Sequence, residues 1–242
     1  MREARGQYIG AMLRALLQGF AARLPSQCAV CHAWPARAVC DECVQCFGQP
    51  LSRCRTCALP VLAGMRQCGA CITQPPPVDH TLAAVAYAYP WASLIAQFKF
   101  QEHTGWAPSL ATLIRSTPWV EPALESADWL LPMPLSSERL RERGFNQTLV
   151  LAHALVRDKV RADVLLRVKH TVAQSSLPRA ERLLGVRGAY AAEPTRAAEI
   201  QGKRVVLLDD VMTTGASLFE AARVLRRAGA LHITALVLAR TE

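Results

Sequence analysis

The chain has 242 residues, of which 51% are hydrophobic, and it carries 28 Lys and Arg against 19 Asp and Glu, a formal net charge of +9. The hydrophobic content excludes extensive disorder, and the length allows one large domain or a small domain plus a medium one. The basic excess is mostly arginine, whose planar guanidinium suits phosphate groups of nucleic acids or small molecules, although a GC-rich genome would give the same excess.

Residues 1–24 have apolar side chains at helical spacing, and Arg14, Gln18 and Arg23 interrupt them. This pattern differs from the continuous apolar segment of a secretion signal. No uninterrupted apolar run reaches the roughly 18 to 20 residues that span a bilayer. We therefore expect an amphipathic N-terminal helix in a soluble, cytoplasmic protein, packed against its own chain rather than against a membrane.

All nine cysteines fall between residues 28 and 71, and eight of them form four C-x2-C pairs. Two such pairs can place four thiolates around one tetrahedral ion, so the spacing predicts two structural zinc sites. The alternatives are a disulfide framework, which needs an oxidising compartment, and a redox C-x-x-C, which usually occurs singly. Proximity along the chain assigns one site to Cys28, Cys31, Cys40 and Cys43, and the other to Cys54, Cys57, Cys68 and Cys71.

Cys46 leaves this pairing open, because it could replace Cys43, and interleaved pairing is also compatible with the spacing. Residues 25–72 hold little apolar material of their own, so metal binding would supply much of the folding free energy of this double zinc ribbon. The three prolines of "ITQPPPVDH" then favour a stiff linker at residues 73–80. We place the boundary to a second domain, residues 81–242, at this linker.

Strand-like and helix-like segments alternate through residues 81–242. The strand-like segments are residues 81–89, 127–135, 203–211 and 232–240, and the helix-like segments are residues 91–100, 106–116, 146–160 and 217–229. The segment 203–211 is apolar without alternation, as expected for a strand that is buried on both faces of a parallel sheet. The order predicts a three-layer α/β fold, a parallel sheet flanked by helices.

The most specific functional pattern is "VVLLDDVMTTGAS", residues 205–217, where an apolar strand leads into two acids, a Thr/Gly turn and a helix. The helix N-terminus and Gly215 suit a phosphate, because backbone N–H groups face it and no side chain blocks its approach. Two carboxylates beside a phosphate require hydroxyls or a divalent cation as partners. A ribose 5-phosphate supplies these groups. The alternative, a solvated strand end with a helix cap, accounts for Ser217 and not for the acid pair.

These residues resemble the phosphoribosyl pyrophosphate (PRPP) signature of type I phosphoribosyltransferases. From about residue 24 onward the chain is similar to the ComF family, to which GntX-type proteins belong. The segments "LLPMPL", "RERGFNQ" at 141–147 and "AQSSLPRAERLLGVRGAY" at 173–190 carry the same resemblance. It implies a type I phosphoribosyltransferase-like domain behind a cysteine-rich zinc ribbon, with PRPP and Mg²⁺ as ligands and a role in the uptake of transforming DNA, that is, in natural competence.

The resemblance also assigns roles to individual residues. Asp209 and Asp210 would bind the ribose hydroxyls beside Mg²⁺ and would act in catalysis, if catalysis occurs. The 5-phosphate would lie on Thr213, Thr214, Gly215, Ala216 and Ser217. Arg139 and Arg143 would face pyrophosphate, or else form an exposed helix face balanced by acids. Asn146 and Gln147 would bind ligand, orient the loop or cap the helix that starts there.

Residues 157–187 carry eight Lys and Arg against three acids and correspond to the mobile hood that closes over pyrophosphate in type I enzymes. A solvated hairpin is the alternative. Gln174, Arg179 and Arg182 are the candidates for ligand contact. The sequence departs from the family at Gly185, where an asparagine is expected.

Three functions remain compatible with these patterns. One is a Mg²⁺-dependent phosphoribosyltransferase acting on an unidentified acceptor, and another is a competence protein that binds single-stranded DNA and has a non-catalytic PRPP site. The last is a structural adaptor. Both PRPP and DNA present phosphates, so charge does not separate the first two. Trp34 and Phe47 are the only aromatic residues of the cysteine-rich segment, which weakens a stacking role for that segment.

Overall fold

A computed structural model of the protein describes residues 27–34, 37–100, 104–169 and 186–242. The expected helix at residues 1–24 lies outside these ranges. By its internal contacts the chain divides into two compact units, residues 1–46 and 47–242. This division does not coincide with the boundary expected at residues 73–80, because the second group of cysteines, from Cys54 to Cys71, belongs to the larger unit.

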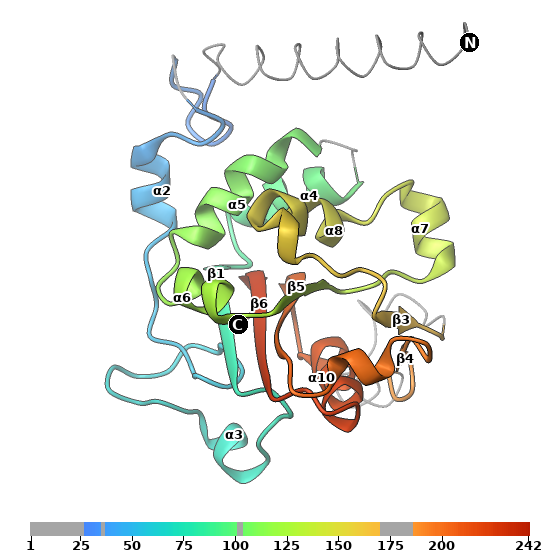
Figure 1. Cartoon of the computed structure of the whole chain (residues 1–242). Coiled ribbons are helices and arrows are strands. Elements are labelled where there is room, and N and C mark those ends of the chain that lie inside the picture. Colours follow the sequence, from blue (N-terminus) through green and yellow to red (C-terminus); the bar gives the residue numbers. More distant parts are fainter. Residues whose placement is uncertain (1–26, 35–36, 101–103, 170–185) are drawn as a thin grey trace, which may run out of the picture. The chain divides into compact units, whose positions relative to one another are not determined.

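A four-stranded parallel sheet forms the centre of the larger unit, in the order β1-β6-β5-β2 (Figure 1). The expected parallel α/β fold is thereby confirmed. β5 and β6 pair along their whole length, from Arg204↔His232 to Met212↔Arg240. The four strands are β1 (His80–Ala86), β2 (Trp129–Pro132), β5 (Arg204–Met212) and β6 (His232–Arg240).

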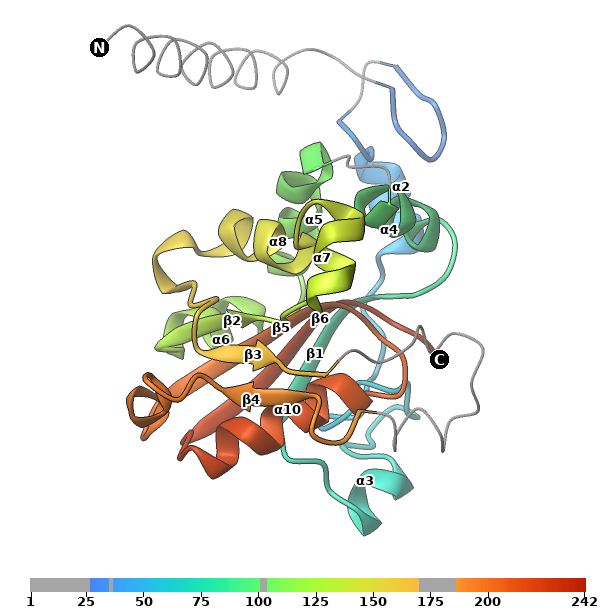
Figure 2. The ribbon, with the colours of Figure 1, turned by 90° about the vertical axis from the view of Figure 1, so that its right-hand side faces the viewer.

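Helices cover one face of this sheet, and Figure 2 shows α4, α5 and α8 on the same side of it. In α5 the buried residues Ala107, Leu110, Ala111 and Ile114 recur at helical spacing and form one apolar stripe. α5, α6 and α8 contact strands of the sheet. The helices of this part are α4 (Trp91–Phe100), α5 (Ala107–Arg115), α6 (Val120–Ser126), α7 (Ser137–Arg143) and α8 (Gln147–Leu155), with 3₁₀ turns η1 (Thr104–Trp106) and η2 (Arg157–Lys159).

The opposite face carries α10 (Ala216–Arg227) and a short antiparallel hairpin of β3 (Leu165–Arg167) and β4 (Tyr190–Ala192), as Figure 2 shows. α10 contacts both β5 and β4. The 3₁₀ turn η4 (Ala197–Ile200) connects the hairpin to β5. No expectation from the sequence covered α6, whereas a helix carrying Arg139 and Arg143 and a hairpin within residues 157–187 were considered only as alternatives. The helix expected at 146–160 ends at Leu155, because Val156 adopts an extended conformation and a 3₁₀ turn follows.

The smaller unit, in its described part, has a minimal core. Cys28, Cys40 and Cys43 pack together with Val30 and Val39. α2 (Asp41–Phe47) follows Cys40, and α3 (Gly69–Thr73) lies in the larger unit between Cys68 and Cys71. Within the described ranges, no helix has the length and apolar character that crossing a bilayer requires.

Candidate functional site

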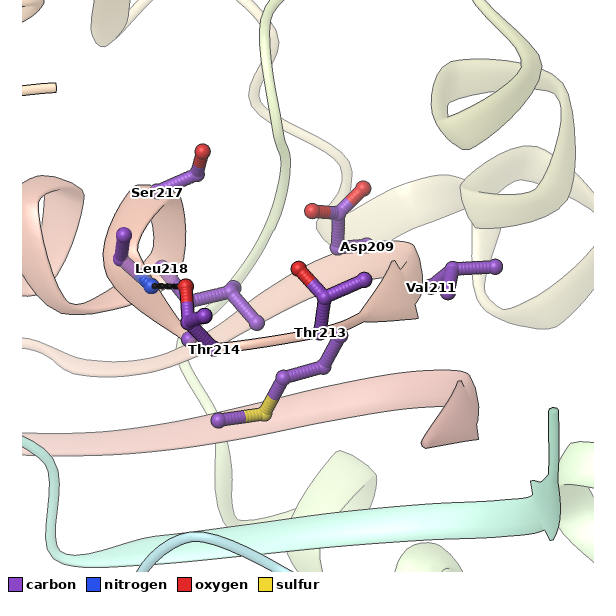
Figure 3. A pocket seen from close by; sticks show the side chains of 9 residues that line it. Asp209, Val211, Thr213, Thr214, Ser217 and Leu218 are labelled. Atoms are coloured by element: carbon purple, nitrogen blue, oxygen red, sulfur yellow. Dashed lines mark hydrogen bonds between the residues drawn. The ribbon is translucent and has the colours of Figure 1, made fainter. Parts of the chain in front are cut away.

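Strand β5 ends beside a hollow that the following turn and the first residues of α10 enclose. Asp209, Val211 and residues 212–218 line it. In Figure 3 the carboxylate of Asp209 and the hydroxyls of Thr213 and Ser217 border the same space. The structure therefore brings Asp209 together with all five residues that were expected to hold a phosphate, residues 213–217.

Gly215 gives the turn its shape. Its φ angle is +79°, in the left-handed region, and it is the N-cap residue of α10. A Cβ at this position would lie 2.5 Å from the Cε of Met212 and 2.5 Å from the Cε2 of Phe219. Only glycine fits here without strain. The Oγ1 of Thr214 accepts a hydrogen bond from the N–H of Ala216 at 3.3 Å, which orders the first turn of the helix.

Asp209 is half-buried at the edge of this hollow. Burial, and then the negative charge of Asp210, raise the pKa of the Asp209 carboxyl to about 7, although Lys99 and the N–H of Asp210 act in the opposite direction. That N–H donates to Asp209 Oδ1 at 2.9 Å. A cation or a hydroxyl donor in the hollow would favour the ionised carboxylate, so this position is suited to a ligand that supplies either.

Asp210 has different surroundings, since adjacent residues of a strand point to opposite faces. It is 3% exposed. The Nζ of Lys99 lies 2.9 Å from Asp210 Oδ1, and the Nε2 of Gln147 donates to Asp210 Oδ2 at 2.9 Å. The N–H of Val211 also donates to Oδ1, at 2.6 Å. Both oxygens are engaged within the protein, and Asp210 does not line the hollow.

Asn146 and Gln147 both serve the fold at the start of α8. The Oδ1 of Asn146 accepts from the N–H groups of Thr148 and Leu149 at 2.9 and 3.3 Å, and its Nδ2 donates to the carbonyl of Met133 at 3.2 Å. Asn146 is thus the helix cap and a tie to the segment after β2. Gln147 is 3% exposed and is turned toward Asp210. Among the roles considered from the sequence, these contacts correspond to capping and orienting.

Three arginines, Arg139, Arg143 and Arg167, influence one another's charge. The pKa of Arg139 is lowered, first by burial and then by the positive charges of Arg167 and Arg143. Arg139 and Arg143 lie on α7, where Ser136 caps the helix by accepting from the N–H of Arg139 at 3.4 Å. The charge of Glu142 acts in the opposite direction and raises the pKa of Arg139.

Tyr190 connects these cations to the hollow. Its hydroxyl accepts from Arg167 Nη1 at 3.4 Å, and Arg167 pairs with it across the β3-β4 hairpin. Burial raises the pKa of Tyr190; the charge of Arg167 lowers it, the charge of Asp209 raises it, and a hydrogen bond with Ser217 lowers it. The hairpin therefore brings one cation and one phenol close to Asp209 and Ser217. Gln174, Arg179, Arg182 and Gly185, which the sequence placed in the hood, lie outside the described residues.

The cysteines form two groups with the membership that proximity predicted, Cys28, Cys31, Cys40 and Cys43 in one and Cys54, Cys57, Cys68 and Cys71 in the other. Within each group the sulfur atoms lie within 4.8 Å of one another. The Sγ atoms of Cys31 and Cys40, and those of Cys57 and Cys68, are 3.6 Å apart. Cys46 is exposed and outside both groups. Each group could hold one metal ion.

Backbone N–H groups point at the sulfur atoms in both groups. Cys28 Sγ accepts from the N–H groups of Val30 and Cys40 at 3.4 and 3.3 Å, and Cys54 Sγ accepts from that of Cys68 at 3.3 Å. Burial opposes ionisation, yet backbone N–H groups, first that of Cys31 for Cys28 and that of Cys68 for Cys54, lower the pKa of Cys28 to about 6 and that of Cys54 to about 7. Such donors stabilise thiolates, the form of cysteine that binds metal.

The second cysteine group is part of the core of the larger unit. Cys54, Cys57 and Cys71 pack in the same buried cluster as the residues of β5, β6 and α10. Two bonds tie its first loop to β1: the N–H of Thr81 donates to the carbonyl of Arg55 at 2.8 Å, and Thr81 Oγ1 donates to that of Thr56 at 2.6 Å. These contacts place the second cysteine group in the larger unit.

Four residues around the site were not singled out from the sequence: Lys99, Arg167, Tyr190 and Arg240. Arg167 and Tyr190 lie in strands of three residues, which are too short for a periodic pattern. Lys99 is one of only four lysines in an arginine-rich chain, and that rarity was the one available indication. Arg240 ends the last strand, where a charged residue usually meets solvent, and yet it is 3% exposed.

Comparison with known proteins gives a consistent result. The sequence profile of the phosphoribosyl transferase domain matches residues 151–242, which span the β3-β4 hairpin, β5, α10 and β6. A protein of Salmonella typhimurium named DNA utilization protein YhgH is 31% identical over 232 residues, covering 90% of this chain and 98% of that protein.

Two relatives carry names that refer to competence. Competence protein F of Haemophilus influenzae is 32% identical over 195 residues, which cover 77% of this chain and 84% of that protein. Competence protein ComFC of Bacillus subtilis is 40% identical over 100 residues, which cover 41% of this chain and 39% of that protein.

Proposed function

Because this chain belongs to the ComF family of proteins with a phosphoribosyltransferase domain, we propose that its larger unit binds PRPP together with Mg²⁺. One observation carries this proposal: a half-buried carboxylate, two hydroxyls and a glycine turn border one hollow at the N-terminus of a 12-residue helix. The helix N-terminus and the N–H groups of the turn suit the 5-phosphate. Asp209 suits the hydroxyls of the ribose.

We revise the role of Asp210 within this proposal. Its oxygens accept from Lys99, Gln147 and the N–H of Val211, and it faces away from the hollow. Asp210 would therefore hold β5 against α4 and α8, while Asp209 alone contacts the sugar. Arg139, Arg143 and Arg167 are the proposed partners of the pyrophosphate, because Arg167 and Arg139 lie near Tyr190 beside Ser217 and Asp209, and guanidinium groups bind phosphate oxygens well. Gln174, Arg179 and Arg182 remain candidates for the same role.

If the protein transfers the phosphoribosyl group, the bond between the anomeric carbon and the pyrophosphate oxygen breaks and a bond to an acceptor forms. A bound Mg²⁺ would neutralise charge on the departing pyrophosphate. The arginines would stabilise the same charge, and Asp209 would hold the sugar in place. This chemistry requires no protein nucleophile, and the identity of the acceptor does not follow from the residues of the hollow.

Calorimetric titration with PRPP and Mg²⁺ tests the proposal on the wild type, Asp209→Asn and Asp210→Asn. We expect Asp209→Asn to weaken binding at least about tenfold, because a charged acceptor for the sugar hydroxyls is lost. Asp210→Asn should weaken it less. The absence of binding to the wild type would refute the ligand, and equal affinities of wild type and Asp209→Asn would refute the role of Asp209.

We also propose zinc as the ion of both cysteine groups. Zinc–sulfur bonds of about 2.3 Å place tetrahedral sulfur atoms roughly 3.8 Å apart. The sulfur pairs Cys31–Cys40 and Cys57–Cys68, at 3.6 Å, fit that geometry, and four thiolates leave no open position for a substrate. The sites are therefore structural in this proposal. Metal analysis should find two zinc ions per chain, and any other stoichiometry or metal would contradict it.

A second function, binding of single-stranded DNA by a protein of the DNA-uptake machinery, is favoured by one further observation. Phe100 is 65% exposed, and the guanidinium of Arg143 lies 4.9 Å from the centroid of its ring. An exposed aromatic ring beside a cation is the arrangement on which unpaired bases stack. The names of the relatives, which refer to DNA utilization and competence, point in the same direction.

Fluorescence anisotropy with a labelled oligo-dT tests this second function. Phe100→Ala should weaken binding by about tenfold, as the loss of one stacked base predicts. Trp119→Ala is the matched control, because Trp119 is 76% exposed and no cation lies over its ring among the described residues. Equal losses in the two variants would argue against a stacking site at Phe100.

A further inference from the structure

A single buried arginine joins the second cysteine group to the turn that borders the hollow. Arg240 is 3% exposed at the end of β6. Its Nε donates to the carbonyl of Cys57 at 2.9 Å, and its Nη1 donates to the carbonyl of Met212 at 3.1 Å and to that of Thr213. One planar guanidinium therefore fixes backbone atoms of two segments that are far apart in the chain.

On one side the guanidinium contacts the loop from Cys54 to Leu59, which carries the carbonyl of Cys57. Cys57 is a member of the second cysteine group, and its loop is closed by bonds from the N–H of Ala58 to the carbonyl of Cys54 at 2.8 Å and from the N–H of Cys54 to the carbonyl of Leu59 at 2.7 Å. A bound ion would hold the four sulfur atoms at coordination distance from one centre. We therefore expect occupancy of the site to constrain the loop that carries the Cys57 carbonyl.

On the other side the guanidinium contacts the start of the turn at residues 213–217, the proposed phosphate site, which we call the phosphate turn. Met212 ends β5, and Thr213 is the first residue of the turn whose hydroxyl borders the hollow. The N–H of Thr241 adds a bond to the carbonyl of Met212 at 3.0 Å. A shift of the guanidinium would therefore move the backbone of Thr213 directly, together with the N–H groups that follow it.

We propose that Arg240 is a positioning residue that couples the metal ion of the second cysteine group to the shape of the phosphate turn. Occupancy of the metal site keeps the Cys57 carbonyl in place, and the guanidinium transmits this to Met212 and Thr213. Coupling of this kind is reciprocal, so a ligand in the hollow should also slow release of the metal. The ligand side of the proposal rests on PRPP binding, whereas the link between cysteine loop and turn does not.

Hydrogen exchange in the absence of PRPP tests the link by itself. In Arg240→Gln we expect the amides of residues 214–218 to exchange about tenfold faster than in the wild type, because charged donors to the turn are lost. Arg53→Gln is the matched control: Arg53 Nη1 donates to the carbonyl of Ala58 at 3.0 Å, on the cysteine loop, and not to the turn. Unchanged exchange in Arg240→Gln, or equal acceleration in both variants, would overturn the proposal.

Zinc release provides a second readout that a merely structural role would not affect. A zinc-selective chelator should remove one of the two ions several-fold more slowly from the wild type when PRPP and Mg²⁺ are present. In Arg240→Gln the effect of PRPP should disappear, and persistence of the full effect would overturn the coupling. If Arg240→Gln does not fold, Arg240→Lys takes its place, since it keeps the buried charge and offers fewer donors.

The two measurements separate this proposal from the function on which it partly rests. Faster exchange at 214–218 in Arg240→Gln, combined with no binding of PRPP to the wild type, would refute the ligand and support the link. PRPP binding to the wild type, combined with unchanged exchange, would support the ligand and refute the link.

Discussion

Strand β5 carries an aspartate on each of its two faces, and the two aspartates have opposite environments. Asp209 faces a solvent-accessible hollow with threonine and serine hydroxyls, and no lysine or arginine among the described residues lies within ion-pair distance of it. Asp210 is buried on the other face and paired with Lys99. Adjacent acids in a strand are therefore not one functional unit. We infer that one carboxylate serves ligand binding and the other serves the packing of β5, and four predictions separate these roles.

The largest effect is expected from removing the cation of the buried face. Lys99→Met would leave the Asp210 carboxylate buried without a counter-charge, which should lower the free energy of unfolding by about 4 kcal/mol. The double variant Lys99→Met/Asp210→Asn removes the charge as well and should recover most of the loss. Urea unfolding measures both. A single variant as stable as the wild type would contradict the buried pair.

On the open face, Gly215→Ala should cost about 3 kcal/mol, because it combines a left-handed backbone with a Cβ that collides with Met212 and Phe219. Gly202→Ala is the control. Gly202 also has a positive φ, +74°, but nothing lies within 4 Å of its added Cβ, so that variant should cost only about 1 kcal/mol. Thermal unfolding compares them, and equal losses would show that the turn is not tightly packed.

The raised pKa of Asp209 predicts a pH dependence of stability. The folded value of about 7 exceeds the ordinary value of 3.8, so the folded state binds the proton more tightly. The associated stability is fully present below pH about 4 and is lost as the pH rises through about 7. In metal-free buffer at pH 8, Asp209→Asn should therefore be more stable than the wild type, by on the order of 2 kcal/mol. A difference that stays constant from pH 4 to 8 would refute the shift.

The smallest effect is expected at Gln147. Its Nε2 donates to Asp210, but its Oε1 is buried with no hydrogen-bond partner in the described structure. Gln147→Leu loses a bond to a charged group and also relieves that unpaired oxygen, so we expect a net loss of only about 1 kcal/mol. A loss as large as that of Lys99→Met would mean that the amide, and not the ion pair, holds Asp210.

The helices and strands of the fold could be predicted from the sequence, whereas the different environments of Asp209 and Asp210 could not. Apolar strands and amphipathic helices predicted the parallel α/β arrangement, and the Thr/Gly turn predicted residues that line the hollow. The alternation of side chains along a strand already separates Asp209 from Asp210. Only the distant partner Lys99, however, shows which of the two is buried, and that contact arises from tertiary packing.

The prolines at 75–77 show a second limit of the sequence. They predict a stiff connector, but a connector can still pack: Val78, directly after them, is 5% exposed in the main core, and the carbonyl of Pro77 accepts from Arg226 at 3.4 Å. Stiffness of the backbone and separation of domains are different properties. The sequence indicates the first, whereas the second depends on which apolar surfaces meet.

The strand order has a consequence for the synthesis of the chain. β1 and β2 are made early, yet in the finished sheet neither touches the other, because β6 and β5 lie between them. Both edge strands leave the ribosome before their neighbours exist, with unpaired backbone groups and apolar faces. The four strands can pair as one sheet only after β5 and β6 have been made. The segment from β1 to residue 203 is therefore synthesised before both central strands of its sheet.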